Sequence, residues 1–194
     1  TVTILALREP DGRPIAVYST YSLHYVGGVP KGDISADYYG VYCDRLERLL
    51  GGNEQDPPLV ALMANASSGD INNVNFRQPR PAKKPYEQIR FVAHDLADKV
   101  HAALAKAEYR DQVTLAARFR ETIVARPSPT AEQIAWAKQT LTKPAPKPDQ
   151  VNLPYSYARR IMGMIDRDEK VSVPLQVLRI GPACIGTMPG EPFC

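Results

Sequence analysis

The chain has 194 residues, 44% of them hydrophobic, which is enough for one sizeable globular domain with a buried core. Its 24 basic residues nearly balance its 21 acidic ones, and a net charge of +3 with interspersed charges argues against a nucleic-acid-binding surface. The longest apolar runs are far shorter than the roughly 20 residues that a membrane-spanning helix needs, so the sequence predicts no transmembrane segment.

The first predicted element is a β-hairpin. Residues 2–7 and 14–19 are rich in β-forming residues and flank an Asp-Gly turn signal. The second strand leads into the segment around His24, so this histidine is expected at or just past a strand end.

A helix and a buried strand come next. Apolar positions at helical spacing predict a helix over residues 37–50, with Ser35 as its cap and a Gly-Gly pair as its stop. Residues 59–64 form a short apolar run after two prolines, which favours a buried strand. The Asn, Ser, Gly and Asp residues of 65–75 then predict a loop.

The middle of the chain alternates between helix and strand signals. Residues 85–108 repeat apolar side chains at helical spacing, and residues 112–125 alternate apolar and polar side chains, which predicts a half-buried strand. Ser128-Pro129 indicates the start of a helix that runs to about Leu141. The proline-rich residues 143–150 predict a stiff surface connector.

The last predicted elements are a helix over residues 154–167 and two strands, 171–180 and 183–188, which turn at Gly181-Pro182. The whole order of strands and helices predicts an α/β fold with a mixed β-sheet flanked by helices.

The ends of the chain suggest that the sequence is a piece of a longer domain. The sequence begins at Thr1 without a leader peptide and stops at Cys194, soon after a Pro-Gly-Glu-Pro turn. We therefore expect residues 1–194 to be part of a single domain that is truncated at both ends. The three cysteines, which include Cys43 and Cys184, are too few and too far apart for a disulfide framework or a metal clip.

His24 is the first candidate site residue. It lies in Tyr-Ser-Leu-His-Tyr-Val-Gly-Gly, where an imidazole could present one ring nitrogen to a metal ion. A buried histidine that is hydrogen-bonded to the backbone would have the same surroundings, so the residue alone leaves both interpretations open.

Two further segments place polar groups after predicted strands. Residues 65–73 (Asn-Ala-Ser-Ser-Gly-Asp-Ile-Asn-Asn) form a polar loop that is typical either of a ligand site or of an ordinary connection. Glu191, in Met-Pro-Gly-Glu-Pro-Phe, follows the last strand on a rigid turn that can direct a carboxylate, although exposed carboxylates are common.

Together these segments resemble the N-terminal catalytic domain of the neutral (non-lysosomal) ceramidase family. That family has a zinc-binding histidine at a strand end, an Asn-x-Gly-Asp-Val-Ser-Pro-Asn loop beside the active site, and an Ile/Val-Pro-Gly-Glu-Phe turn with a zinc-binding glutamate. Here the counterparts keep the same chain order: His24 in Ser-Leu-His-Tyr, residues 68–72 (Ser-Gly-Asp-Ile-Asn) and residues 187–193 (Thr-Met-Pro-Gly-Glu-Pro-Phe). Residues 34–40 (Ile-Ser-Ala-Asp-Tyr-Tyr-Gly) also fit the family's segment after the histidine.

The resemblance implies a zinc-dependent hydrolase in which His24 and Glu191 hold Zn²⁺ and a metal-activated water cleaves an N-acyl amide, as in ceramide, to an amine and a fatty acid. Asp70 would orient the substrate or groups around the metal. Asn72 replaces the family's serine, so it could donate a hydrogen bond to the oxyanion but could not be a nucleophile. The family's other ligands, an upstream histidine and a downstream tyrosine, align outside this chain, and the piece alone is expected to be inactive.

Two alternatives stay open beside this function. Asn72 also fits a non-catalytic relative that binds a lipid or glycan on the same scaffold, and a zinc hydrolase of another amide or ester would carry the same motifs. Family analogy implies a secreted or periplasmic protein with a lipid amide substrate and peripheral membrane contact, and the small net charge argues against a nucleic-acid partner. The sequence does not indicate an oligomeric state.

Overall fold

The computed structural model of the chain describes residues 1–78, 81, 83–147 and 150–193. They form two compact units, Thr1–Gln112 with Gly190–Cys194, and Val113–Pro189. The predicted α/β class is confirmed, and the strands divide into two three-stranded sheets. Part of the predicted connector, residues 148–149, lies outside the described residues, as does Cys194.

The first unit contains a mixed sheet with the strand order β1-β2-β3. Strands β1 (Val2–Arg8) and β2 (Pro14–Tyr21) form the predicted antiparallel hairpin, and Gly12 in its turn has φ +98°. Strand β3 (Val60–Asn65) is parallel to β2, with Tyr21 opposite Asn65. Neighbouring parallel strands require a long crossover connection, and the connection between β2 and β3 contains a helix.

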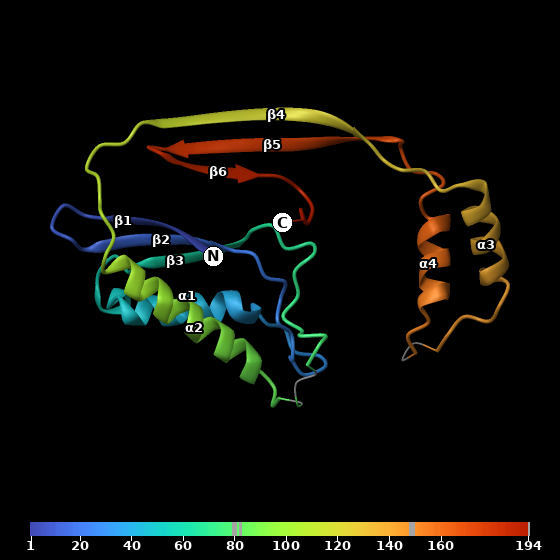
Figure 1. The fold of residues 1–194 in the computed structure, drawn as a ribbon, viewed down its shortest axis with the longest axis horizontal. Coiled ribbons are helices and arrows are strands. Elements are labelled where there is room, and N and C mark those ends of the chain that lie inside the picture. Colours follow the sequence, from blue (N-terminus) through green and yellow to red (C-terminus); the bar gives the residue numbers. More distant parts are fainter. Residues whose placement is uncertain (79–80, 82, 148–149, 194) are drawn as a thin grey trace. The chain divides into compact units, whose positions relative to one another are not determined.

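Two helices lie on one face of this sheet (Figure 1). Helix α1 (Asp37–Leu49) forms the crossover and is followed by the short 3-10 helix η1 (Gly52–Glu54), while α2 (Glu87–Leu104) follows the polar loop. The apolar positions of α2 recur at helical spacing and are buried, which explains why this segment is helical and where it packs. These buried residues are Ile89, Ala93, Leu96, Ala97 and Val100.

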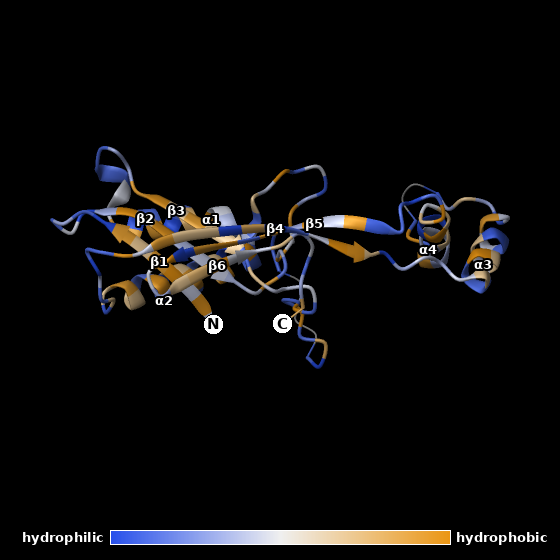
Figure 2. Cartoon of the chain, turned by 90° about the horizontal axis from the view of Figure 1, so that it is seen from above, coloured by the Kyte–Doolittle hydropathy of each residue, from blue (hydrophilic) through white to orange (hydrophobic). Residues whose placement is uncertain are grey.

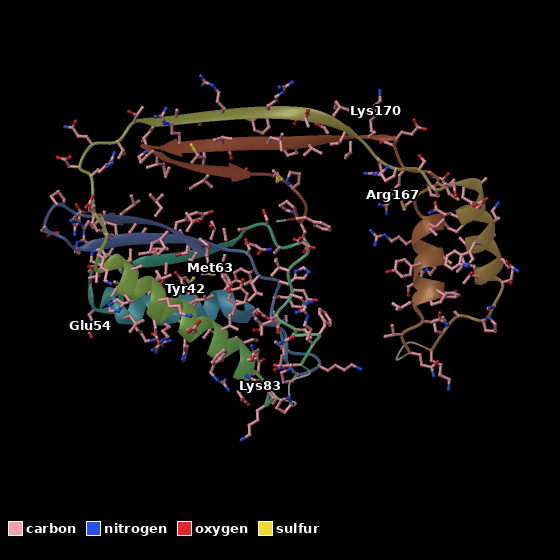
Figure 3. All side chains as sticks on the ribbon, viewed as in Figure 1. Tyr42, Glu54, Met63, Lys83, Arg167 and Lys170 are labelled. Carbon is pink, nitrogen blue, oxygen red and sulfur yellow. The ribbon has the colours of Figure 1, made fainter. Side chains whose placement is uncertain are left out.

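The core of the first unit lies between the sheet and the helices. Tyr38, Tyr42 and Leu46 of α1 are fully buried there, and Val17 of β2 is nearly so. Figure 3 labels Tyr42 and Met63 in this interior, and Met63 packs against the buried cluster. Figure 2 shows the concentration of hydrophobic residues along the strands of this sheet.

The second unit contains an antiparallel sheet and a helical pair. Strands β4 (Leu115–Ala125), β5 (Lys170–Ile180) and β6 (Ala183–Thr187) pair in chain order. Between β4 and β5 the chain forms α3 (Ala131–Leu141) and α4 (Leu153–Met162), which pack against each other. No helix of the residues described here is long and apolar enough to cross a bilayer.

Three local predictions differ from the structure. The cap of α3 is Thr130 in place of Ser128, because the Thr130 hydroxyl accepts from Gln133 N and the Gln133 side chain accepts from Thr130 N. Helix α4 ends at Met162, before the predicted Arg167, and the backbone beyond Gly163 continues in turns such as the one closed by Met164 N and Ile161 O at 3.0 Å. Ser35 does not cap α1 in the usual way; its hydroxyl accepts from Asp37 N, and the helix has Ala36 as its N-cap.

The prediction of a half-buried β4 is wrong. Its apolar side chains Leu115, Phe119 and Ile123 share one face of the strand and are 63–70% exposed. Alternation in a sequence establishes which side chains share a face, but it does not establish that another element covers that face.

Candidate metal site

The candidate site lies where β2 and β3 end. Because these strands are parallel, their carboxyl ends meet at the same edge of the sheet, and Ala66 N donates to Tyr21 O at 3.1 Å across that edge. His24 follows the end of β2, and the polar loop with Gly69 follows the end of β3. Loops after parallel strands are the usual place for a ligand site in an α/β sheet.

A backbone contact attaches the Glu191 turn to this edge. Gly69 N donates to Pro192 O at 3.0 Å, and both residues belong to the first unit. A Cβ at position 69 would collide with the Glu191 carbonyl oxygen and would lie 2.6 Å from Cδ1 of Phe193. Glycine is therefore required here, because the backbones approach too closely for any side chain.

His24 and Glu191 are brought together by this arrangement. Nδ1 of His24 lies 3.9 Å from Oε1 of Glu191, which is too far for a hydrogen bond and close enough for both to contact one ion. The His24 side chain is 28% exposed and that of Glu191 is 62% exposed. Within the part of the chain that the structure describes, no group of three or more His, Cys, Asp or Glu residues is placed to hold a metal.

The other two predicted site residues lie on the loop after β3. Asp70 and Asn72 are both exposed. The Asn72 side-chain oxygen accepts from Val74 N at 3.1 Å, which is a local turn interaction. Among the described residues, no hydrogen bond or ion pair joins Asn72 to His24 or Glu191.

Sequence reasoning missed the residues that hold the loop around His24. The carbonyl oxygen of Leu23 accepts from the hydroxyl groups of Tyr38 and Tyr39 at 3.0 and 3.3 Å. Burial raises the pKa of the Tyr38 phenol, so this group stays a proton donor across the ordinary pH range. On the other side of His24, the Asp37 carboxylate accepts from the backbone N–H groups of Val26 and Gly27.

Two more contacts complete the loop's support. Asn73 Nδ2 donates to Val26 O at 3.3 Å, and Tyr86 N donates to Gly28 O at 3.1 Å. The glycine pair at 27–28, where both residues have positive φ, was the visible signal that this loop has a special backbone path. The sequence contained no signal for which side chains would hold it.

A pocket of about 240 Å³ lies beside this loop. It is smaller than the usual pocket for a complete small-molecule ligand. It is lined by Val26, Gly27, Gly28, Asn73, Val74, Asn75, Lys83 and Gln88.

Solved structures of ceramidases resemble this chain. One is the crystal structure of neutral ceramidase from Pseudomonas aeruginosa, with a TM-score of 0.56 and 16% identity over 93% of this chain and 32% of that one. Another is described as ceramidase complexed with C2, with a TM-score of 0.53 and 16% identity over 93% of this chain and 34% of that one. No protein-family model matches the sequence, and no curated protein matches it.

The similarity at this level of identity concerns the fold, and the chain spans about a third of the length of the ceramidases it matches. The resemblance drawn from the sequence motifs is therefore confirmed independently by the backbone: this chain has the fold of a ceramidase segment.

Proposed function

We propose that this chain supplies part of the metal site of a zinc-dependent hydrolase that cleaves an N-acyl amide, as a ceramidase does. The observation that carries the proposal is the 3.9 Å separation between His24 Nδ1 and Glu191 Oε1. These are the two residues that the motifs name as metal ligands, and they come from opposite ends of a chain with a ceramidase-like fold.

The donor atoms fit zinc. Imidazole nitrogen and carboxylate oxygen are both common zinc ligands, and two such atoms about 2.1 Å from a tetrahedral ion lie about 3.4 Å apart. A rotation of the exposed Glu191 side chain that shortens the present distance by about 0.5 Å would let both groups bind one ion. A catalytic zinc takes about three protein ligands, so we propose that the full-length protein supplies the rest.

The chain's own residues would act by binding and orientation. When bound, zinc lowers the pKa of a coordinated water toward neutrality and polarises a carbonyl. His24 and Glu191 would hold the ion, Asp70 would orient the substrate, and Asn72 could donate a hydrogen bond to the oxyanion that develops on the amide. The reaction adds the water oxygen to the carbonyl carbon, breaks the C–N bond and transfers the water's protons to the leaving nitrogen, which releases a fatty-acid carboxylate and a protonated amine.

The proposal extends to the setting of the reaction. We propose a lipid amide as substrate, peripheral contact with a lipid surface, and a secreted or periplasmic location. These follow from the ceramidase-like motifs and fold alone.

The decisive test is the zinc content of the full-length protein, measured by elemental analysis beside the release of fatty acid from a fluorescent ceramide. We expect stoichiometric zinc and amide cleavage in the wild type, and loss of both in His24→Ala and Glu191→Ala. His94→Ala, which changes a histidine of α2 that none of the three motifs includes, is the matched control and should retain both. Retention of zinc in the two site variants would overturn the assignment of these ligands.

The second candidate is a non-catalytic relative that binds a lipid or glycan, and the observation that favours it is Asn72 in place of the family's serine. The same experiment separates the candidates. Zinc without cleavage of any amide or ester substrate would favour the binding protein, whereas cleavage of a substrate other than ceramide would keep the hydrolase and change its substrate.

A further inference from the structure

Asp37, the first residue of α1, has an unusual backbone conformation. Its φ of +52° lies in the left-handed region, which costs a residue other than glycine about 1–3 kcal/mol unless the surroundings hold it. Aspartate is among the residues that tolerate this region best, because its short side chain can accept hydrogen bonds from nearby backbone groups.

The Asp37 carboxylate is occupied by three backbone donors. Oδ1 accepts from Val26 N at 2.8 Å and from Tyr38 N at 2.7 Å, and Oδ2 accepts from Gly27 N at 2.8 Å. A helix-capping side chain satisfies N–H groups of its own helix. Here only one donor belongs to α1, while two belong to the loop just after His24, so the geometry is more than a cap.

The two residues after Asp37 hold the other side of the histidine. The hydroxyl groups of Tyr38 and Tyr39 both donate to Leu23 O, and their rings stack with centroids 4.2 Å apart. The first turn of α1, residues 37–39, therefore bonds the backbone one residue before His24 and two and three residues after it. These contacts restrain the backbone from which the imidazole extends.

We propose that Asp37 is a positioning residue that fixes the His24 imidazole opposite Glu191, with Tyr38 and Tyr39 completing the restraint. Hydrogen-bonding partners behind a metal ligand orient it, and their loss typically weakens metal binding about 10- to 100-fold. The link to zinc rests on the proposed function. The restraint of the His24 ring does not depend on a metal.

The test compares Asp37→Asn with Asp44→Asn in the full-length protein. Asp44 is an exposed carboxylate on the same helix and is the matched control. Two readouts are needed: the zinc dissociation constant by competition with a chelator, and the ring signal of His24 in metal-free, ¹³C-histidine-labelled protein, assigned by its loss in His24→Ala.

We expect Asp37→Asn to raise the zinc dissociation constant about 10- to 100-fold and to broaden or split the His24 signal, with Asp44→Asn unchanged in both. Asp37→Gly removes the carboxylate but adopts positive φ without strain, so it should fold and show the same losses. A folded Asp37→Gly protein with wild-type zinc affinity and an unchanged His24 signal would overturn the proposal. If the wild type binds no zinc, the proposed function fails, and the His24 signal alone decides the role of Asp37.

Discussion

Tyr42 of α1 is fully buried and shares a 2.7 Å hydrogen bond with Ser19 of β2 inside the core. Burial raises the pKa of Tyr42 from 10.0 to about 12, and the bond to Ser19 opposes part of this rise. The folded chain therefore keeps the phenol proton at pH values where the unfolded chain has lost it.

The sign of this shift predicts loss of stability in alkali. The contribution is complete below pH 10 and is lost as the pH rises from 10 through 12, at up to about 1.4 kcal/mol per pH unit for one tyrosine. Urea unfolding of this chain between pH 9 and 12 should show a shallower decline for Tyr42→Phe than for wild type. Tyr25→Phe, which alters an exposed tyrosine, should keep the wild-type slope.

The close approach of two backbones at Gly69 predicts that one added carbon atom will weaken zinc binding. Gly69→Ala adds a Cβ where the Glu191 carbonyl and the Phe193 ring already lie, so the Glu191 turn must shift from its present position beside the loop after β3. We expect zinc affinity of the full-length protein to fall by about 10-fold or more with little change in melting temperature. Gly186→Ala, whose Cβ meets nothing within 4 Å, is the control. Equal zinc affinity in both variants would contradict the close approach.

At the scale of elements, the capping box of α3 gives a discriminating prediction. Thr130→Ala removes the hydroxyl that accepts from Gln133 N and should destabilise the helical pair by about 0.5–2 kcal/mol. Ser128→Ala, at the cap that the sequence suggested, should change stability by much less. Trp136, the one tryptophan in the sequence, lies on α3, so its fluorescence during denaturation reports this pair. A larger effect from Ser128→Ala would show that the sequence-based cap is correct.

Most elements could be predicted because their signals are local. The apolar repeat of α2 and the turn between β1 and β2 depend on neighbours in the sequence. Whether another element covers one face of a strand does not depend on sequence neighbours. For this reason β4 was predicted to be half-buried although Phe119 and Ile123 are exposed. The division of the strands into two sheets likewise depends on pairings that no local pattern specifies.

The candidate site shows the same limit. His24 and Glu191 could each be selected only as ambiguous residues, and the resemblance to ceramidases joined them. The sequence predicted Asp37 only as the first residue of a helix. Its contacts could not be predicted, because its carboxylate accepts from backbone groups 10 and 11 positions earlier in the chain. Contacts of that range have no periodicity, so the sequence carries no direct sign of them.

At the scale of the whole molecule, the second unit is an insertion between two parts of the first. Its helical pair joins strand ends that already lie together, since Ala125 pairs with Lys170 and Arg126 N donates to Glu169 O at 2.7 Å. This division into two compact units does not test whether residues 1–194 are part of a single catalytic domain, which stays a prediction.

This insertion predicts a tolerated deletion. Replacing residues 127–168 with Asn-Gly should leave a two-residue hairpin between β4 and β5, because that pair favours the required turn. We expect the full-length variant to keep its zinc content, since α3 and α4 pack on each other. Deleting residues 190–193 is the contrasting variant and should abolish zinc binding. Loss of zinc in the hairpin variant would show that the helical pair supports the metal site.

The return of the chain to Gly69 also sets an order of events during synthesis. Residues 1–112 leave the ribosome early and can form their core, but the partner of His24 is translated only after the entire second unit. Until then the nascent protein would carry only one of the two proposed ligands at this edge of the sheet. Capture of the proposed zinc would therefore be a late step, and a prematurely terminated product that lacks residue 191 would be folded in its first part yet unable to bind the ion through both proposed ligands.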